Sequence, residues 1–259
     1  MPSRLRGLKP AVAAMAWLAC LAAPAIGQPA AFTSEQRDAI EQVVKQYLVR
    51  NPEVLQEAIA ELEKRQADAQ RKAQAAALAE TRGALMTSPH GNVFGNPAGD
   101  VTLVEFFDYN CGYCKRALAD IRALIKSDAK LKVVLKDLPV LGPESVEATR
   151  VALAVKQQSS GDKLFEYHSR LLETRGRVGG EQALKLAREM GFDMARLQRD
   201  LGGPEVKAAM AENSELGEKL ALTGTPAFVI GDEVISGAVG VEPLRQAIAM
   251  TRKCGRAVC

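Results

Sequence analysis

The residues of this sequence best suited to chemistry are two cysteines, Cys111 and Cys114, in the run Cys-Gly-Tyr-Cys. A buried strand predicted over residues 101–107 leads into this pair, and a helix is predicted to follow over 115–127. A thiol at a helix N-terminus meets unpaired backbone N–H groups and the positive end of the helix dipole. In Cys-x-x-Cys pairs these lower the first thiol's pKa from about 8.5 to roughly 3.5–7.5. We therefore expect Cys111 to attack a disulfide and the more buried Cys114 to resolve the mixed disulfide.

A zinc site and an inert structural disulfide are the competing interpretations of this pair. Structural zinc needs four ligands, but no second ligand pair with the usual short spacing is present, and the chain has only two histidines, His90 and His168. A chain of this size can bury a core and does not need a disulfide in order to fold. We therefore predict redox chemistry, with no bound metal and no cofactor.

Glu105 interrupts the apolar run that precedes Cys111. Burying a carboxylate costs free energy, so a buried carboxylate is expected to have a function. Burial also raises its pKa. If its side chain points inward beneath the following helix, Glu105 is suited to accept the proton of Cys114. The alternative is an edge position at which the carboxylate faces solvent.

A proline, Pro226, stands directly before a predicted strand in the run Gly-Thr-Pro-Ala. Proline is excluded from the centre of a sheet, so this residue either begins an edge strand or follows a cis peptide bond. A cis bond would let the backbone of Thr225 face the cysteines and pair with an extended substrate. Together with Gly112 and Tyr113, these two residues are the predicted substrate-binding residues.

The elements predicted around the site alternate between strands and helices. In order they are strands over 93–94 and 101–107, a helix over 115–127, a strand over 132–135, helices over about 144–210, a hairpin over 227–235 and a helix over 242–252. This order predicts an α/β thioredoxin fold with an inserted helical subdomain, over residues 91–253.

Residues 1–27 have the features of an export signal: a basic start, an apolar run and the small-residue cleavage site Ala25-Ile26-Gly27. The apolar run is shorter than the roughly 20 residues that span a bilayer, which disfavours a membrane anchor. Removal of the signal also removes Cys20 and leaves four cysteines in an oxidising compartment.

Two amphipathic helices are predicted within residues 28–66, the first begun by a capping box at Thr33 and the second by Asn51-Pro52-Glu53. Residues 67–90 form an Ala-rich connector with almost no large apolar side chain before Leu85. The apolar faces of the two helices must be buried either against copies of the chain or on its own main domain. We expect self-association.

The charge balance argues against nucleic acid as a partner. The chain has 34 basic and 31 acidic residues, but Arg4, Arg6 and Lys9 lie in the export signal, which contains no acidic residue. The remainder is therefore balanced, whereas nucleic-acid binding depends on a surplus of cationic side chains. The 47% of hydrophobic and 25% of charged residues are typical of a globular protein.

Residues 106–115, Phe-Phe-Asp-Tyr-Asn-Cys-Gly-Tyr-Cys-Lys, together with the later Gly-Thr-Pro-Ala-Phe, resemble the bacterial periplasmic disulfide oxidoreductases of the DsbA superfamily. The resemblance implies a cis Thr225–Pro226 bond, Cys111 as nucleophile, Cys114 as resolving thiol and Glu105 as the buried carboxylate. It also implies a periplasmic location, misfolded or reduced periplasmic proteins as substrates, and a membrane thiol-disulfide reductase or oxidase as partner.

The N-terminal part of the sequence resembles one particular group within this superfamily. An export signal, an Asn-Pro-Glu-Val-Leu helical segment, an Ala-rich connector and a Cys-Gly-Tyr-Cys domain together resemble the suppressor-of-copper-sensitivity C (ScsC) proteins and their Com1-like relatives. In that group the N-terminal helices can form trimers, members can act as isomerases kept reduced by a membrane partner, and some are linked to copper tolerance. The resemblance implies a homotrimer formed by residues 28–66.

The dipeptide Gly112-Tyr113 differs from the Pro-His of the strong oxidase in this superfamily and matches that of the periplasmic isomerase. A histidine beside the first cysteine stabilises the thiolate and hence the reduced form, so neutral Tyr113 predicts a less oxidising pair. This favours isomerase or reductase activity. A dithiol oxidase and a copper(I)-binding protein are the alternative functions.

A second cysteine pair, Cys254 and Cys259, lies in the tail at residues 254–259, outside the pattern of the superfamily. A surface disulfide, an auxiliary redox pair and a copper(I) site are all compatible with this Cys-x4-Cys spacing.

Overall fold

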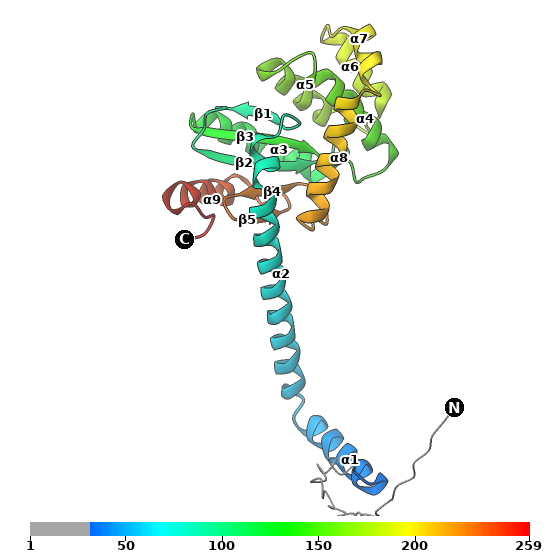
Figure 1. Ribbon diagram of the computed structural model, residues 1–259, viewed down its shortest axis with the longest axis vertical. Helices are drawn as coiled ribbons and strands as arrows, with labels where there is room; N and C mark the ends of the chain where they lie inside the picture. The colour runs from blue at the N-terminus through cyan, green and yellow to red at the C-terminus, as the bar shows by residue number, and fades with distance from the viewer. Residues whose placement is uncertain (1–31) are drawn as a thin grey trace, which may run out of the picture. The chain divides into compact units, whose positions relative to one another are not determined.

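The structure is a computed structural model that describes residues 32–259. The predicted export signal, residues 1–27, lies outside the described residues. The described residues fall into two compact units, of which the first ends at residue 61 and the second covers residues 62–259. All strands of the described part belong to the second unit (Figure 1).

The described helices and strands follow the predicted order. In chain order they are α1 (Ser34–Arg50), α2 (Glu53–Thr87), β1 (Asn92–Gly95), β2 (Val101–Phe107), α3 (Gly112–Ser127), β3 (Leu131–Asp137), α4 (Pro143–Lys156), α5 (Gly161–Glu173), α6 (Gly180–Glu189), α7 (Met194–Asp200), α8 (Pro204–Lys219), β4 (Ala227–Ile230), β5 (Glu233–Ser236) and α9 (Val241–Cys254).

The five strands form one mixed sheet in the order β1-β3-β2-β4-β5. β2 and β3 are parallel, with Glu105 opposite Leu135, and α3 connects them as a βαβ unit. The remaining neighbours are antiparallel, and β4 and β5 form the predicted hairpin. This arrangement confirms the α/β thioredoxin fold expected from the sequence.

The side chains of β2 alternate between two apolar cores. Leu103 and Phe107 belong to the larger core, with residues of α3 and α9, whereas Val104 and Phe106 belong to a second core with residues of α2 and α8. Successive strand residues point to opposite faces of a sheet. Glu105 therefore lies on the face that α3 covers.

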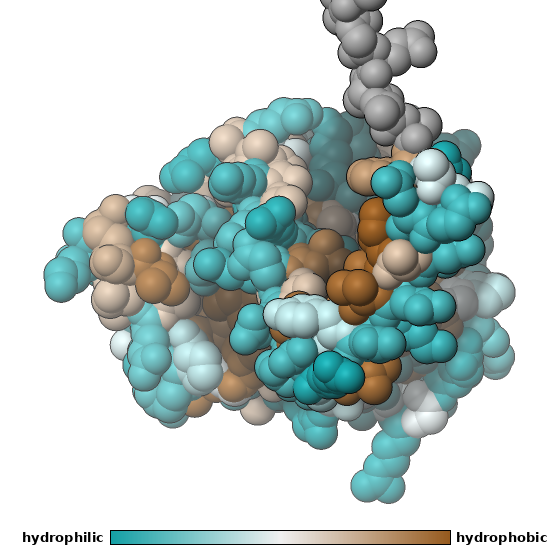
Figure 2. Space-filling model, turned by 90° about the horizontal axis from the view of Figure 1, so that it is seen from below, coloured by the Kyte–Doolittle hydropathy of each residue, from teal (hydrophilic) through white to brown (hydrophobic). Residues whose placement is uncertain are grey.

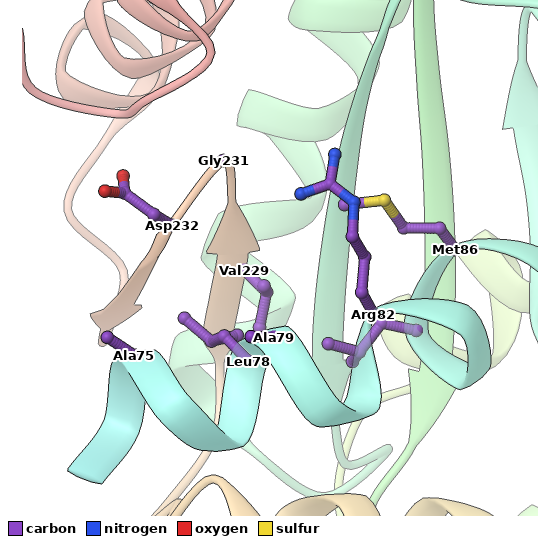
Figure 3. A pocket seen from close by; sticks show the side chains of 9 residues that line it. Ala75, Leu78, Ala79, Arg82, Met86, Val229, Gly231 and Asp232 are labelled. Carbon is purple, nitrogen blue, oxygen red and sulfur yellow. The ribbon is translucent and has the colours of Figure 1, made fainter. Parts of the chain in front are cut away.

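The structure corrects the prediction for the Ala-rich connector. α2 is one helix from Glu53 to Thr87, and its residues Leu78, Thr81 and Leu85 are buried. Leu78 lies beside Val229 of β4, at a small cavity of about 110 Å³ (Figure 3). Two leucines seven residues apart share one helix face, and the alanines around them let this face approach the sheet closely. The end of α2 is thus part of the second core.

The inserted subdomain consists of α4 to α8 and continues beyond the predicted end near residue 210. α8 ends at Lys219, before Ala221, which has a positive φ of 51°. Gly217 lies inside α8 where the helix passes close to Leu138, since a Cβ at this position would be 3.0 Å from a leucine methyl group.

The first unit contains α1, which begins with the predicted capping box. The N–H of Gln36 donates to Thr33 Oγ1 at 3.3 Å, and the N–H of Thr33 donates to Gln36 Oε1 at 3.0 Å. No residue of α1 is buried. Figure 2 shows hydrophobic side chains at the surface between hydrophilic ones. The large hydrophobic side chains exposed on α1 are Ile40, Val43, Val44, Tyr47 and Val49.

Candidate active site

Cys111 is the N-cap residue of α3, directly after the loop that leaves β2. The sequence placed the start of this helix at residue 115, but the first turn includes Gly112 and Cys114. The backbone N–H of Cys114 donates to Cys111 Sγ at 3.2 Å. The earlier start therefore puts the sulfur at the first N–H groups of the helix, where the positive end of the dipole lies.

These contacts lower the pKa of Cys111 from 9.0 to about 6. The largest contribution is the hydrogen bond with the Cys114 side chain. Hydrogen bonds with the Thr225 side chain and with the backbone N–H groups of Cys114 and Tyr113 add to it, while burial opposes ionisation. Cys111 is therefore mostly a thiolate at pH 7.

Cys114 is the opposite case, because its side chain is wholly buried at the start of α3. Burial raises the pKa of the Cys114 thiol, and its hydrogen bond with Cys111 raises it further. The two are free thiols in the structure. One sulfur of the pair is thus ionised and the other keeps its proton.

Glu105 is 3% exposed, on the sheet face that α3 covers. Burial raises the pKa of its carboxyl to about 8, and the negative charges of Cys111 and Asp120 also raise it. Of the two predicted orientations, the structure has the buried one. The site therefore holds a carboxyl group that gains and loses its proton near neutral pH.

The peptide bond between Thr225 and Pro226 is cis, as the sequence resemblance implied. Cys111 Sγ lies 3.1 Å from the carbonyl oxygen of Thr225, to which it donates a hydrogen bond when it is protonated. Gly112 and Tyr113 are exposed, and the guanidinium of Arg116 lies 4.3 Å from the centroid of the Tyr113 ring. Beside them is a cavity of about 280 Å³, lined by Tyr113, Thr223, Gly224, Thr225, Pro226, Ser236, Gly237 and Ala238. The predicted substrate-binding residues are thus close to the cysteine pair.

His168 lies in a buried aromatic cluster. Its ring is 4.6 Å from that of Phe107 between centroids, and burial lowers its pKa to about 3, so the imidazole is neutral. His90 belongs to a different part of the domain, at a cavity between α4 and α8. Within residues 32–259 no three histidine, cysteine, aspartate or glutamate side chains are grouped so that they could hold a metal ion.

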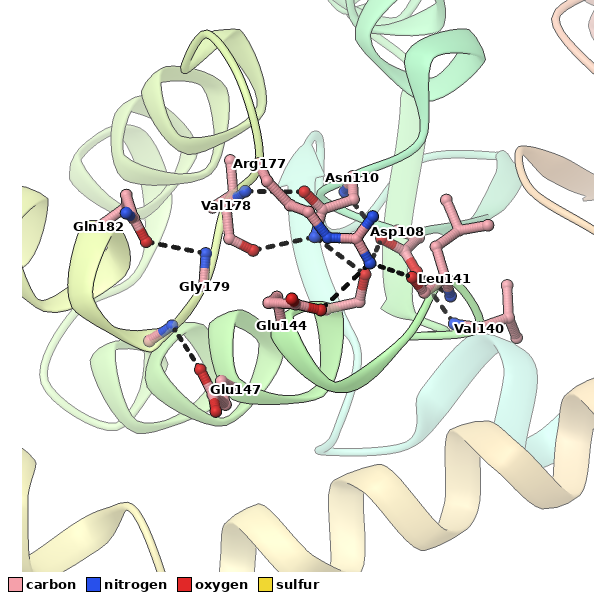
Figure 4. A network of polar contacts seen from close by, with 12 residues as sticks. Asp108, Asn110, Val140, Leu141, Glu144, Glu147, Arg177, Val178, Gly179 and Gln182 are labelled. Carbon is pink, nitrogen blue, oxygen red and sulfur yellow. Dashed lines mark hydrogen bonds and ion pairs between the residues drawn. The ribbon is translucent and has the colours of Figure 1, made fainter.

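Two residues of the site, Asp108 and Asn110, were missed by the sequence analysis. They form a polar network that ties the cysteine loop to the inserted helices (Figure 4). The available signal was the change from the apolar β2 strand to polar residues immediately before Cys111. Their partners are distant in sequence, which is why spacing alone did not reveal them.

Cys254 and Cys259 form a disulfide with an S–S distance of 2.05 Å. Both residues are exposed, whereas Ala257 between them is buried. Asp232 in the β4–β5 turn accepts hydrogen bonds from Ala257 N at 3.0 Å and from Arg256 Nε at 2.9 Å. In the structure, therefore, the pair is a disulfide at the surface of the protein.

Residues 102–249, more than half of the chain, match the family model of the DSBA-like thioredoxin domain. The chain belongs to this family. Residues 36–69 match a second family model, the copper resistance protein ScsC N-terminal domain. The two matches place the chain in the DsbA superfamily, close to the ScsC proteins.

Solved structures support this assignment. A thioredoxin-like oxidoreductase from Silicibacter pomeroyi is 42% identical, with a TM-score of 0.63, and the match covers 67% of this chain and 98% of that chain. ScsC from Proteus mirabilis in a transitional conformation is 27% identical, with a TM-score of 0.62. The match covers 86% of this chain and 99% of that chain.

Curated relatives differ in length from this chain. The thiol:disulfide interchange protein DsbA of Bordetella pertussis is 26% identical over 149 residues, which is 54% of this chain and 68% of that protein. The Na⁺/H⁺ antiporter NhaA 1 of Salinispora arenicola is 26% identical over 159 residues, and the match spans only 24% of the antiporter. Within residues 32–259 of this chain, none of the helices is long and apolar enough to cross a membrane.

Proposed function

We propose that this chain is a periplasmic thiol-disulfide oxidoreductase that isomerises or reduces disulfides of misfolded proteins through Cys111 and Cys114. The observation that carries the proposal is the position of Cys111: a thiol of low pKa at the start of α3, 3.1 Å from the carbonyl oxygen of Thr225. Cys114 is buried next to it with its proton retained. This is the asymmetry that disulfide exchange requires.

In the first step, the Cys111 thiolate attacks one sulfur of a substrate disulfide. A new S–S bond joins Cys111 to the substrate, and the second substrate sulfur leaves as a thiolate. The backbone of Thr225, exposed Tyr113 and the cavity beside them are suited to hold an extended substrate segment near Cys111.

In the resolving step, Cys114 must lose its proton to a nearby base. Formation of the mixed disulfide removes the charge of Cys111, which is one of the causes that raise the pKa of Glu105. The pKa of Glu105 then falls, and its carboxylate accepts the Cys114 proton. The Cys114 thiolate attacks Cys111 Sγ, forms the internal disulfide and releases the substrate sulfur as a thiolate. During isomerisation, another substrate thiolate attacks the mixed disulfide instead.

The residues between the cysteines support the isomerase or reductase direction. Tyr113 carries no charge that would stabilise the thiolate further, and the pKa of Cys111, about 6, is well above the lowest values, roughly 3.5, found in Cys-x-x-Cys pairs. A less stabilised thiolate makes the pair less oxidising. A membrane thiol-disulfide reductase would then keep the dithiol reduced.

The test is reactivation of ribonuclease with scrambled disulfides by the mature protein in a glutathione buffer, with Cys111→Ser as the control. We expect reactivation by the wild-type protein that is lost in the variant. Failure to reactivate, together with fast oxidation of a reduced peptide, would replace the isomerase proposal with the dithiol oxidase.

Copper(I) binding is the second candidate, favoured by the match of residues 36–69 to a copper resistance protein domain. The free thiols Cys111 and Cys114 are soft ligands of the kind that copper(I) prefers. The bonded pair Cys254–Cys259 offers no thiolate. Titration with copper(I) of protein that has Cys111 and Cys114 reduced and the Cys254–Cys259 disulfide intact tests this candidate. Tight binding without ribonuclease reactivation would favour copper holding over catalysis.

We also propose that the chain forms a homotrimer through residues 28–66. The support is the exposed apolar side chains on α1 and the first turns of α2, since apolar patches of this kind mark interaction surfaces. The exposed apolar side chains on α2 are Leu55, Ile59 and Leu62, each about half exposed.

A further inference from the structure

The side-chain amide of Asn110 makes two opposed hydrogen bonds to a single residue of the inserted subdomain. Asn110 Nδ2 donates to the carbonyl oxygen of Val178 at 2.9 Å, and the N–H of Val178 donates to Asn110 Oδ1 at 2.7 Å (Figure 4). An amide side chain thus pairs with the backbone as a neighbouring strand would. Val178 lies in the loop between α5 and α6, and its own side chain is buried.

Asp108 fixes the other side of the same short loop. Its buried carboxylate accepts hydrogen bonds from the N–H of Asn110 at 2.7 Å, from Ser145 Oγ at 2.7 Å, and from the N–H groups of Val140 and Leu141 at 2.9 and 3.0 Å. Asn110 Nδ2 also donates to Ser145 Oγ at 2.9 Å. The two polar residues before Cys111 are therefore joined to one network with the start of α4.

This network includes the backbone of Cys111 itself. The N–H of Cys111 donates to the carbonyl oxygen of Asp108 at 3.0 Å. On the other side of the cysteine, Lys115 Nζ donates to the carbonyl oxygen of Thr174, in the same α5–α6 loop, at 2.7 Å. Cys111 thus lies between two attachments to one loop of the inserted subdomain.

We propose that Asn110 is a positioning residue for Cys111, because its amide pairs the cysteine loop with the α5–α6 loop and so holds the sulfur at the N-terminus of α3. The inference rests on the proposed function. Helix-dipole stabilisation falls off within the first turn of a helix. The N–H of Cys114 donates to Cys111 Sγ at 3.2 Å, and a displacement of the loop that lengthens this hydrogen bond weakens it.

The expected effect of Asn110→Ala is an upward shift of the Cys111 thiolate pKa by about one unit. A less stable thiolate disfavours the reduced form. The equilibrium in which the dithiol reduces oxidised glutathione, giving the Cys111–Cys114 disulfide and two molecules of reduced glutathione, then moves toward the protein disulfide by about fivefold at pH 7. Asn110→Asp retains one acceptor, loses both donated hydrogen bonds and adds a charge, so it should shift the pKa further.

The experiment measures thiolate absorbance at 240 nm against pH, and the glutathione equilibrium at pH 7, for the full mature protein and its variants. The matched control is Asn96→Ala. Asn96 also bonds the backbone through both ends of its amide, donating to Ala129 O at 2.9 Å and accepting from Ala98 N at 2.9 Å, but in the turn after β1. We expect the control to keep the wild-type values.

The inference is overturned if the Asn110 variants keep the wild-type midpoint of the Cys111 thiolate titration and the wild-type glutathione equilibrium, even with reduced thermal stability. It is also overturned if Asn96→Ala shifts both values as much as Asn110→Ala does. Should Asn110→Ala not fold, Ser145→Ala removes one partner of the network and is expected to give a smaller shift in the same direction; an unchanged midpoint would also overturn the inference. A wild-type protein that shows no thiolate below pH 8 and no exchange with glutathione would instead contradict the proposed function.

Discussion

At the scale of single residues, the site depends on three groups whose ionisation is linked. Cys111 has a lowered pKa, Cys114 a raised one, and the pKa of Glu105 depends partly on the charge of Cys111. A change in the covalent state of one sulfur therefore changes the proton affinity of the carboxyl group behind it. Two predictions follow from this linkage.

The first prediction concerns Cys111→Ala in the reduced protein. Because the folded-state pKa of Cys111, about 6, is below its value of 9.0 in the absence of these contacts, the thiolate stabilises the fold above pH 9, and this contribution is lost as the pH falls through 6. The stability difference between the wild type and the variant should therefore be larger at pH 8 than at pH 5. Denaturant titrations at both pH values provide the check, and the same difference at both would contradict the low pKa.

The second prediction is that Glu105→Gln slows the resolving step by about 100-fold, because in the proposed mechanism Glu105 accepts the Cys114 proton. Stopped-flow measurement of release of a peptide from its mixed disulfide with Cys111 gives this rate. An unchanged rate would remove Glu105 from the mechanism.

Stability provides the control for this variant. The folded-state pKa of Glu105, about 8, is above its ordinary value of 4.5, so ionisation opposes folding and the wild type loses stability as the pH rises from 4.5 to 8. Glu105→Gln should remove this loss. A variant that is both folded and more stable at pH 8 shows that slow resolution does not come from damage to the fold.

The sequence was sufficient to predict the site residues that the residue type alone makes conspicuous at its position. Glu105 stands out as a charge in an apolar strand, and Pro226 as a proline before one. Asp108 and Asn110 act through hydrogen bonds to residues of other loops, such as Val178, whose proximity depends on how the inserted helices pack. No periodicity along the chain encodes that proximity.

At the scale of elements, the sheet was predictable because its strands are short apolar runs bounded by turn residues. The end of α2 was not predictable, because the faces of an alanine-rich helix differ little in hydrophobicity. Two leucines were too few to reveal the buried face. In the structure, Leu78 and Leu85 complete the core that covers one face of the sheet. The domain therefore begins well before residue 91, the boundary expected from the sequence.

The third prediction tests this element. Leu85 is 1% exposed, so Leu85→Ala should lower the free energy of unfolding by about 2–5 kcal/mol, through lost burial and the cavity that remains. The control in the same helix is Lys72→Ala, which truncates an exposed side chain outside the proposed trimer segment and should change stability by less than about 0.5 kcal/mol. Equal effects in denaturant unfolding would mean that the end of α2 is not part of the core.

At the scale of the whole molecule, the fourth prediction is that the mature protein self-associates and has the mass of the proposed trimer in solution. α1 has no buried residue and exposes several large apolar side chains, which self-association would cover. Val43→Asp, at a side chain that is 66% exposed, should give monomers, whereas Glu41→Gln on the same helix should not. Light scattering measures the mass. A monomeric wild-type protein would contradict the proposed self-association.

The most direct test of the central claim is capture of a substrate by Cys114→Ser. Without Cys114, only another substrate thiolate can release the mixed disulfide, so it should be longer-lived than in the wild type. Incubation with scrambled ribonuclease, followed by mass spectrometry of proteolytic fragments, locates the bond. The proposed function predicts that ribonuclease peptides are joined to Cys111, one to each protein chain. It predicts no captured peptide when Cys111→Ser is tested in the same way. Absence of any captured peptide, or capture through Cys254 or Cys259, would contradict it.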